Sequence, residues 1–306
     1  MNNTNPTGLF GKLPAHGDFI YRDLPAQFMT VFDSWLQGFV GGSQEQLGEQ
    51  WLETYLTSPI WRFAFSEGVI DENGWAGLFL PSVDRVGRYF PFSIATRLPG
   101  SIAPTEFIST QMQWYDAMED IALRALDGEL QIEDIVEEIN QPDLLIDSSY
   151  VRGSCVDNTS ALVMNMEFEE QSPSTVIPYM LDACLTHLLA SYSAWSTKGS
   201  QLVEPCLFTS KGLPPIGGIA AMLDGRWEEW RWQQPFYLNA GGLSVGENEF
   251  NPQLAERRLE PEQVPEQVSE PETEHVLASD QAEEPQLDSK IQTIIPEDDE
   301  LFGSSE

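Results

Sequence analysis

The sequence predicts an α/β fold with a mixed β-sheet that is covered by helices on both faces. Segments with apolar residues at helical spacing alternate with short segments that are apolar throughout. Strands with continuous apolar sequence are typical of a sheet that is buried on both faces. Of the 306 residues 41% are hydrophobic, and nine Trp and sixteen Phe supply enough material for a large core.

Apolar periodicity predicts two helices near the N-terminus. Between residues 28 and 39, Phe and Trp recur every three or four positions, which places them on one face of a helix. In the next segment, Leu47, Trp51 and Tyr55 are spaced four residues apart. The spacing therefore predicts an amphipathic helix in each segment.

Three strands are predicted before residue 100. Residues 61–65 and 76–80 are apolar enough to be buried strands, and Asp71-Glu72-Asn73-Gly74 supplies turn residues between them. We expect these two strands to form a β-hairpin or to lie next to each other. Residues 92–97 give a further strand.

The second half of the chain continues the mixture of helices and strands. The predicted elements are helices over 114–125, 132–139 and 181–192, an alternating segment at 164–168, and a last strand pair made of 206–209 and 230–232.

The chain divides by charge into a body, residues 1–246, and a tail, residues 247–306. The tail has 18 acidic and 3 basic residues, six prolines and no Trp, so it cannot bury enough apolar surface to fold alone. We predict an acidic disordered tail. The body is also acidic, with 31 acidic and 12 basic residues, and it holds all nine Trp.

The formal net charge of −34 excludes several classes of partner. Nucleic acids and anionic membranes are bound through Lys and Arg, which are scarce here. The first residues lack the basic and apolar regions of a signal peptide, and no apolar run is long enough to span a membrane. We therefore expect a cytoplasmic protein with no membrane insertion, and a basic partner surface fits its acidity.

No cofactor or metal site is predicted. The three histidines, His16, His187 and His275, occur singly, and the three cysteines fit neither a disulfide framework nor a paired zinc motif. The sequence also lacks a phosphate-binding loop of the Walker type.

The most unusual segment of the chain is residues 81–91, which concentrate charge between two prolines. In Pro-Ser-Val-Asp-Arg-Val-Gly-Arg-Tyr-Phe-Pro, Asp84 can pair with Arg85 or Arg88, and Gly87 permits a positive φ or a close approach of backbone. Two interpretations are open. One Arg is held internally while the other presents its fork to a partner's carboxylate or phosphate, or the whole group is an internal ion-pair network.

A second cluster of ionisable residues lies near the N-terminus, where Lys12, His16, Asp18 and Arg22 fall within eleven residues. These residues either bind a charged group of a partner or form an ion-paired loop that fixes the first strand against the first helix. Among these four, Asp18 is the strongest candidate for a site residue, because an Asp after Gly and before an apolar residue often caps neighbouring backbone amides.

With Pro59-Ile60-Trp61-Arg62-Phe63 between them, these two segments resemble the TagF (ImpM) family of type VI secretion accessory proteins. The motif-rich part of the resemblance covers about residues 8–98, and a looser match extends from about 150 to 246. The resemblance implies a layered α/β/α sandwich for the body, and it includes Arg62, Ser82 and Gly87 among the motif residues.

The resemblance also implies a function. Proteins similar to this one act after translation to hold the type VI secretion apparatus inactive, through the cytoplasmic forkhead-associated scaffold protein and opposite a Ser/Thr kinase and phosphatase pathway. We accordingly expect a non-enzymatic negative regulator that binds a secretion component, with the forkhead-associated scaffold as its partner.

An enzyme with an unrecognised active site is the alternative. His16, Asp18, Ser82, Asp84 and Arg88 include the residue types of a hydrolytic triad. Ser82 is not within a G-x-S-x-G elbow, so no feature of the sequence marks it as an exposed nucleophile. Geometry discriminates between the two classes: an open pocket with an unpaired His16 or Ser82 favours an enzyme, and internally paired charges favour a binding protein.

Overall fold

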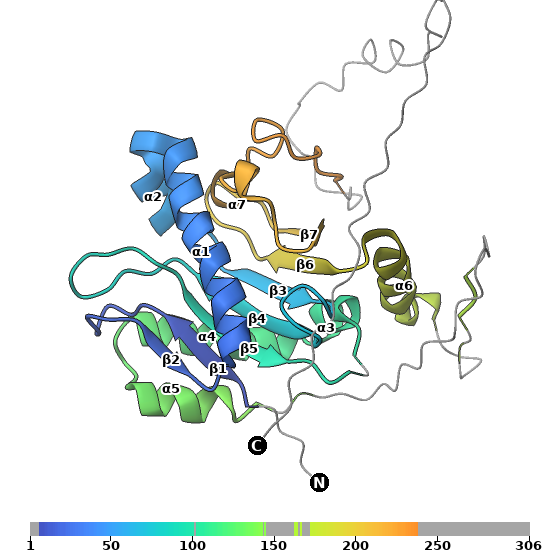
Figure 1. Ribbon diagram of the computed structural model, residues 1–306, viewed down its shortest axis with the longest axis horizontal. Coiled ribbons are helices and arrows are strands. Elements are labelled where there is room, and N and C mark those ends of the chain that lie inside the picture. The colour runs from blue at the N-terminus through green and yellow to red at the C-terminus, as the bar shows by residue number, and fades with distance from the viewer. Residues whose placement is uncertain are drawn as a thin grey trace, which may run out of the picture. The chain divides into compact units, whose positions relative to one another are not determined.

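The computed structural model describes residues 6–100, 102–142, 144, 162–164, 166 and 172–237. Within these ranges the chain forms one seven-stranded sheet with helices on both faces (Figure 1). The elements in chain order are β1 (Gly8–Gly11), β2 (Ile20–Arg22), α1 (Ala26–Leu47), η1 (Gly48–Gln50), α2 (Trp51–Leu56), β3 (Trp61–Phe65), β4 (Trp75–Leu80), β5 (Phe92–Arg97), α3 (Pro104–Thr110), α4 (Met112–Leu126), α5 (Ile132–Ile139), η2 (Pro173–Thr175), α6 (Ile177–Leu189), β6 (Tyr192–Thr197), β7 (Cys206–Lys211), η3 (Ile216–Gly218) and α7 (Ala221–Asp224).

The strand order is β2-β1-β5-β4-β3-β6-β7, and every pair of neighbouring strands is antiparallel. The layered α/β class predicted from the sequence is confirmed. The strand directions within the described sheet are antiparallel, however, where the sequence indicated a mixed sheet. Continuous apolar strands arise here because both faces of an antiparallel sheet are covered, so burial does not require parallel strands.

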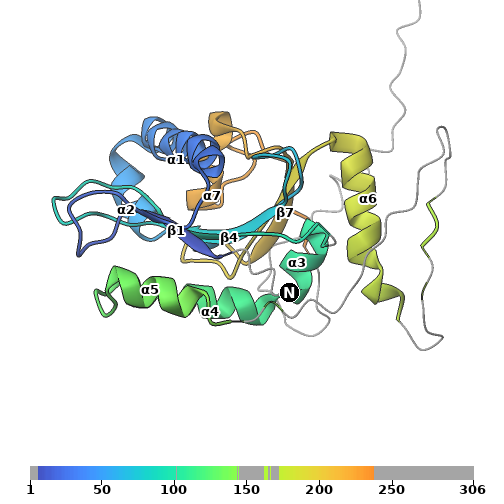
Figure 2. The ribbon, with the colours of Figure 1, turned by 60° about the horizontal axis from the view of Figure 1, so that its bottom comes forward.

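A layer that contains α1, α2 and α7 covers one face of the sheet (Figure 2). Aromatic side chains fill the core between this layer and the sheet. Phe32 of α1 packs against Phe63 of β3, and Trp35 packs against Trp195 of β6, with ring centroids 5.2 and 5.3 Å apart. Burying rings of this size supplies a large share of the apolar stabilisation of a domain. The periodic Phe and Trp residues of the first predicted helix therefore anchor α1 to the sheet.

The opposite face of the sheet is covered by α3, α4 and α5. The core on this side is mainly aliphatic, with Leu78 and Ile94 of the sheet packed among residues of α4 and α5 such as Met118 and Ile135. Side chains alternate between the two faces along each strand. Consecutive residues of one strand thus enter two different cores.

Two elements differ from those predicted in the second half of the chain. The helical stripe was predicted to run through residue 192, but α6 ends at Leu189 and Tyr192 begins β6. Ala190, with φ of 64°, turns the chain out of the helix without the glycine that usually marks such an end. Leu181 and Leu188, two apolar residues of this helix, are exposed.

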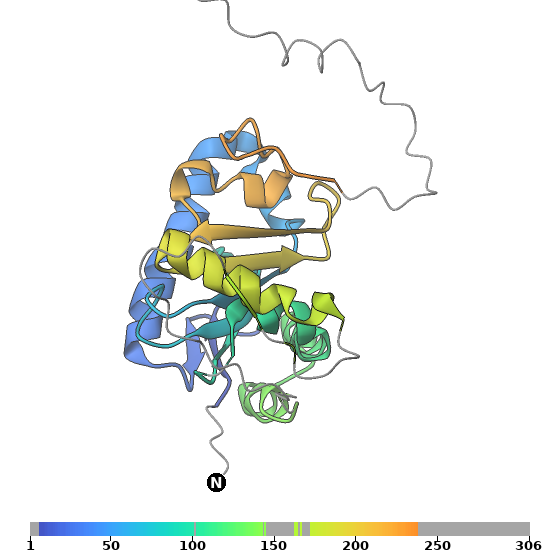
Figure 3. The same cartoon turned by 90° about the vertical axis from the view of Figure 1, so that its right-hand side faces the viewer.

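The last strand pair is β6 with β7, not residues 206–209 with 230–232 (Figure 3). Residues 230–232 form no strand, and Arg231 has a φ of 65°. The tryptophans of this region instead pack as side chains on β7: Trp227 and Trp232 lie 5.8 and 5.1 Å from the ring centroid of Phe208. The aromatic residues of this segment therefore serve to pack against β7 and do not form a strand.

Two predictions lie wholly or partly outside the described residues. The tail, 247–306, and its boundary with the body fall there, as do Asn165, Glu167 and Phe168 of the alternating segment. These predictions stay predictions.

Candidate functional site: two loops joined at Asp84

The sheet brings the two charged loops together. The first loop joins β1 to β2, and the second joins β4 to β5. Because β1 and β4 both pair with β5, Gly11 and Leu80 both lie opposite Phe92. The residues that follow β1 and β4 therefore leave the sheet at the same end, on either side of β5. A Cβ on Gly11 would lie 2.1 Å from the carbonyl oxygen of Pro91, so the close approach of the backbones at this point requires glycine.

Asp84 lies at the centre of the junction, and its side chain is fully buried. Its Oδ1 accepts hydrogen bonds from the backbone N–H groups of Val86 (3.0 Å) and Arg88 (2.8 Å). Its Oδ2 contacts Nζ of Lys12 (3.1 Å) and Nε of Arg88 (2.7 Å). A buried carboxylate with this many donors is strongly stabilised in its charged form.

The pKa of Asp84 follows from these contacts. Burial alone would raise the pKa, but the hydrogen bonds from the Arg88 backbone, from Lys12, from the Arg88 side chain and from Val86 outweigh burial. They hold the pKa of Asp84 well below its usual range. The carboxylate is therefore ionised throughout the physiological range and fixes the shape of the second loop.

Ser82 belongs to the structural framework of the junction. Its hydroxyl is buried and donates to the carbonyl oxygen of Lys12 (2.7 Å), which ties the second loop to the first. The backbone N–H of Ser82 donates to the hydroxyl of Tyr55 (3.2 Å), and that hydroxyl also contacts the Ser82 carbonyl. The Ser82 hydroxyl thus bonds to backbone and makes no hydrogen bond to His16, the base that a triad would need.

The two arginines of the second loop have different surroundings. Arg88 is held by Asp84, donates to the carbonyl oxygen of Gly17, and lies 3.5 Å from Asp18. Arg85 is exposed, and within the described part of the chain its side chain makes no ion pair or hydrogen bond. Its backbone N–H, in contrast, donates to the carbonyl oxygen of His16 (2.9 Å). Arg85 is therefore a free guanidinium on an anchored backbone.

Gly87, His16 and Arg22 complete the predicted residues of the two loops. Gly87 has a φ of 87°, and open space surrounds the position of its missing Cβ, so the turn needs glycine for its conformation. His16 is half-buried beside the second loop. Arg22 is exposed on β2, and its side chain donates to the carbonyl oxygen of Tyr21 (2.8 Å).

Exposed apolar side chains lie beside the charged residues, and no pattern in the sequence singled them out. Phe19 is 47% exposed, packs on Phe90 with ring centroids 4.8 Å apart, and has Nζ of Lys12 4.9 Å above its ring centroid. Tyr21 is 64% exposed and Val86 is 65% exposed. We call Phe19, Tyr21, Arg85, Val86 and Arg88 together the two-loop platform.

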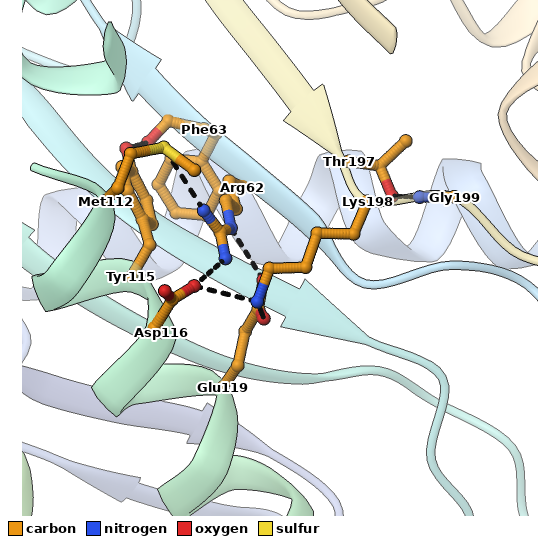
Figure 4. Close-up of polar contacts among 9 residues, drawn as sticks. All are labelled: Arg62, Phe63, Met112, Tyr115, Asp116, Glu119, Thr197, Lys198 and Gly199. Carbon is orange, nitrogen blue, oxygen red and sulfur yellow. Dashed lines mark hydrogen bonds and ion pairs between the residues drawn. The ribbon is translucent and has the colours of Figure 1, made fainter. Parts of the chain in front are cut away.

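Arg62, the remaining predicted residue, lies in a separate cluster between β3 and α4 (Figure 4). Its Nε donates to Glu119 (2.6 Å) and its Nη2 to Asp116 (2.6 Å). Lys198, just after β6, contacts both carboxylates at 2.6 and 2.7 Å. The sequence did not predict these partners, although a buried Arg within an apolar strand and two carboxylates three residues apart on a helix are the signals that could have found them.

The Arg62 cluster is closed. Nη1 of Arg62 lies 3.5 Å from the sulfur of Met112, and the guanidinium packs 5.2 Å from the ring centroid of Tyr115. Burial lowers the pKa of Arg62, but the two carboxylates outweigh it and raise the pKa above its usual value. Among the described residues, the two cations of this cluster balance its two anions, and the ion pairs join β3, α4 and the residue that follows β6.

Comparison with known proteins identifies the class. Residues 8–141 match the TagF N-terminal domain, described as type VI secretion system-associated. Among solved structures, the chain is similar to the protein PA0076 of Pseudomonas aeruginosa PAO1, with 30% sequence identity and a TM-score of 0.58. The match covers 76% of this chain and 98% of that one. No protein with curated annotation matches the chain significantly.

The family match identifies this layered α/β domain as an accessory domain of type VI secretion. The chain belongs to the TagF family. Within the described residues, no helix combines the length and the apolar character that crossing a membrane would require.

Proposed function

We propose that this protein is a non-enzymatic negative regulator of type VI secretion that works in the cytoplasm. It binds a component of the apparatus, the forkhead-associated scaffold protein, and keeps that component from assembling. The family gives the link to type VI secretion. The binding mechanism is supported by the form of the two loops.

The observation that carries the proposal is the contrast between Arg85 and its neighbours. Lys12 and Arg88 both pair with Asp84 and hold the loops in one shape, while the side chain of Arg85 makes no hydrogen bond or ion pair with any residue that the structure describes. A guanidinium that is exposed on a rigid backbone binds a carboxylate or phosphate with little loss of conformational entropy. The site is therefore better suited to binding a partner than to catalysing a reaction.

The contacts of Ser82 and Asp84 favour binding over catalysis for the same reason. A nucleophilic serine needs a base within hydrogen-bond reach, but Ser82 donates to a backbone carbonyl. A catalytic carboxylate near pH 7 needs a raised pKa or a free lone pair facing substrate, and Asp84 has a lowered pKa and four donors around it.

A pull-down from a secretion-competent cell tests the proposal. The bait is the full chain, as wild type and as Arg85→Ala/Arg88→Ala, and captured proteins are identified by mass spectrometry. Lys211→Ala is the matched control, because Lys211 is an exposed cation at the far edge of the sheet with no ion pair among the described residues.

We expect wild type and Lys211→Ala to recover the forkhead-associated scaffold and the double variant to lose it. If the double variant recovers as much scaffold as wild type, the scaffold binds another surface. If wild type recovers no secretion component, the binding mechanism is wrong.

A further inference from the structure

The two-loop platform combines apolar and cationic side chains in a way that points to the chemistry of its partner. Phe19, Tyr21 and Val86 are each about half exposed or more, although side chains of these types are usually found in a protein core. Phe10 lies opposite Tyr21 in the β1–β2 pair and stacks on Phe19 with ring centroids 5.8 Å apart, so Phe19 and Tyr21 share one face of the sheet. Exposed aromatic residues that are supported from beneath are typical anchors of interfaces.

The charge of the platform is opposite to that of the chain. Arg85 has no ion pair with the residues placed in the structure, and the side chain of Arg88 is 54% exposed even though Asp84 contacts its Nε. Two acidic residues at this edge are exposed: Asp18, which lies 3.5 Å from Arg88, and Asp23, which follows β2. In a protein with a formal net charge of −34, a free arginine between apolar side chains marks one place where an anion is attracted.

The platform is preorganised. Backbone hydrogen bonds from Asp84 to Arg88 (3.1 Å) and from Gly87 to Asp84 (3.0 Å) close the second loop, and Phe90 donates to the carbonyl oxygen of Ser82 (3.1 Å). The side chains that bind therefore project from a backbone that does not have to order on binding. Such a site retains most of the interaction free energy as affinity.

From these three features we propose that the two-loop platform binds a segment of the partner protein in which carboxylates flank an aromatic or aliphatic side chain. One carboxylate pairs with the free fork of Arg85, and the apolar side chain packs on Phe19 and Tyr21. This inference rests on the proposed function, because it states what the regulated component presents to this site.

Selection from a random peptide library displayed on phage tests the chemistry without knowledge of the partner. The full chain is the bait, and the selected peptides are sequenced. We expect enrichment of Asp and Glu around Phe, Trp or Leu. Binding of the selected peptides to Arg85→Ala should fall about tenfold or more, which is the size expected for one lost charge-assisted hydrogen-bonded pair.

A second variant, Phe19→Ser, separates the apolar part of the site from the charged part. Phe19→Ser should weaken the selected peptides without altering their dependence on salt, whereas Arg85→Ala should reduce that dependence, because only the arginine contributes a charge. Lys211→Ala serves as the control and should bind as wild type does. Circular dichroism spectra that overlay the wild-type spectrum show that each variant is folded.

Several results would overturn the inference. These are selection of basic or uncharged peptides, failure to select any peptide, and binding that survives Arg85→Ala. A separate experiment, the measurement of secretion in cells, tests the proposed function. If acidic peptides bind at Arg85 but Arg85→Ala still represses secretion, the inference holds and the proposed function fails. If Arg85→Ala loses repression but the selected peptides are not acidic, only the inference fails.

Discussion

The two charged clusters of this domain are inverse arrangements. In one, the buried cation Arg62 lies between two carboxylates, and the second cation Lys198 completes the balance. In the other, the buried anion Asp84 lies between two cations, Lys12 and Arg88. Both clusters connect segments that are far apart in the sequence, and both hold a buried charge that would be costly to leave alone.

The difference between the clusters is in what they leave unpaired. Around Arg62 each of the four charged groups has an opposite charge within 2.7 Å, so every member of the cluster is paired. Around Asp84 the pairing fixes a loop from which Arg85 and Val86 project. A closed ion-pair network stabilises a fold, whereas a network that presents a free group can also support recognition.

Loss of Arg62 should have the largest effect on stability. Arg62→Ala removes the buried cation and leaves Asp116 and Glu119 to Lys198 alone. We expect a loss of about 3 kcal/mol in the free energy of unfolding, at the lower end of the range for a broken buried pair, because Lys198 remains. Urea unfolding followed by Trp fluorescence measures it.

Lys198→Ala is the control within the same cluster. Lys198 is 58% exposed, so its loss should cost less than about 1 kcal/mol. Equal losses for the two variants would mean that the buried position of Arg62 does not matter and that the cluster acts through surface charge.

The contribution of Asp84 should appear as a dependence on pH. The folded-state pKa of Asp84 is lowered, so its contribution to stability is complete above the unfolded-state pKa of about 4. That contribution is lost as the pH falls through the folded-state value. Asp84→Asn should therefore be less stable than wild type at pH 7, and the difference should shrink as the pH falls below about 4.

Urea unfolding of both proteins between pH 7 and pH 2 measures this difference. Asp116 and Glu138 also have lowered pKa values, but they are present in both proteins and cancel in the comparison. Parallel stability curves for the two proteins would show that Asp84 is not the titrating group.

The elements that the sequence predicted well are those whose burial is uniform. Residues 61–65 and 92–97 match β3 and β5, in which apolar side chains such as Trp61, Phe63 and Ile94 are buried in the cores on the two faces of the sheet. The end of α6 was missed because Ala190 takes a positive φ without any sequence signal. The strand at 230–232 was predicted wrongly because aromatic residues have high strand propensity, and here they serve as packing side chains.

The candidate site was predictable in part. Proline, glycine and charge in residues 81–91 indicated a specialised loop, and both loops do meet. Composition could not say which arginine Asp84 holds, since Arg85 and Arg88 are both near it in sequence. Asp84 pairs with Arg88 because the turn at Gly87 places both the backbone N–H and the side chain of Arg88 against the Asp84 carboxylate. Phe19 and Tyr21 carried no signal, because an exposed aromatic residue looks like a core residue until the fold is known.

Arg85→Ala and Arg88→Ala should separate recognition from structure. Arg85 makes no ion pair among the described residues, so its loss should change the free energy of unfolding by less than about 0.5 kcal/mol while repression of secretion is lost. Arg88→Ala should reduce repression too, but with a measurable loss of stability, because Asp84 loses its Nε partner. The readouts are cargo secreted from cells that express each variant and the urea midpoint of the purified proteins. Full repression by Arg85→Ala would show that repression does not depend on Arg85.

The smallest effect is expected from removing residues 247–306. These residues lie outside those that the structure describes, and their composition, with no Trp and 18 acidic residues, offers little apolar surface to bury. The thermal midpoint of residues 1–246 should therefore stay within a few degrees of that of the full chain, as measured by differential scanning calorimetry at equal ionic strength. Loss of the tail also removes a net charge of −15, so the comparison is repeated at high salt, where charge repulsion is screened. A midpoint that falls by about 10 °C or more at both salt concentrations would mean that the tail contributes to the core and that the domain boundary lies beyond residue 246.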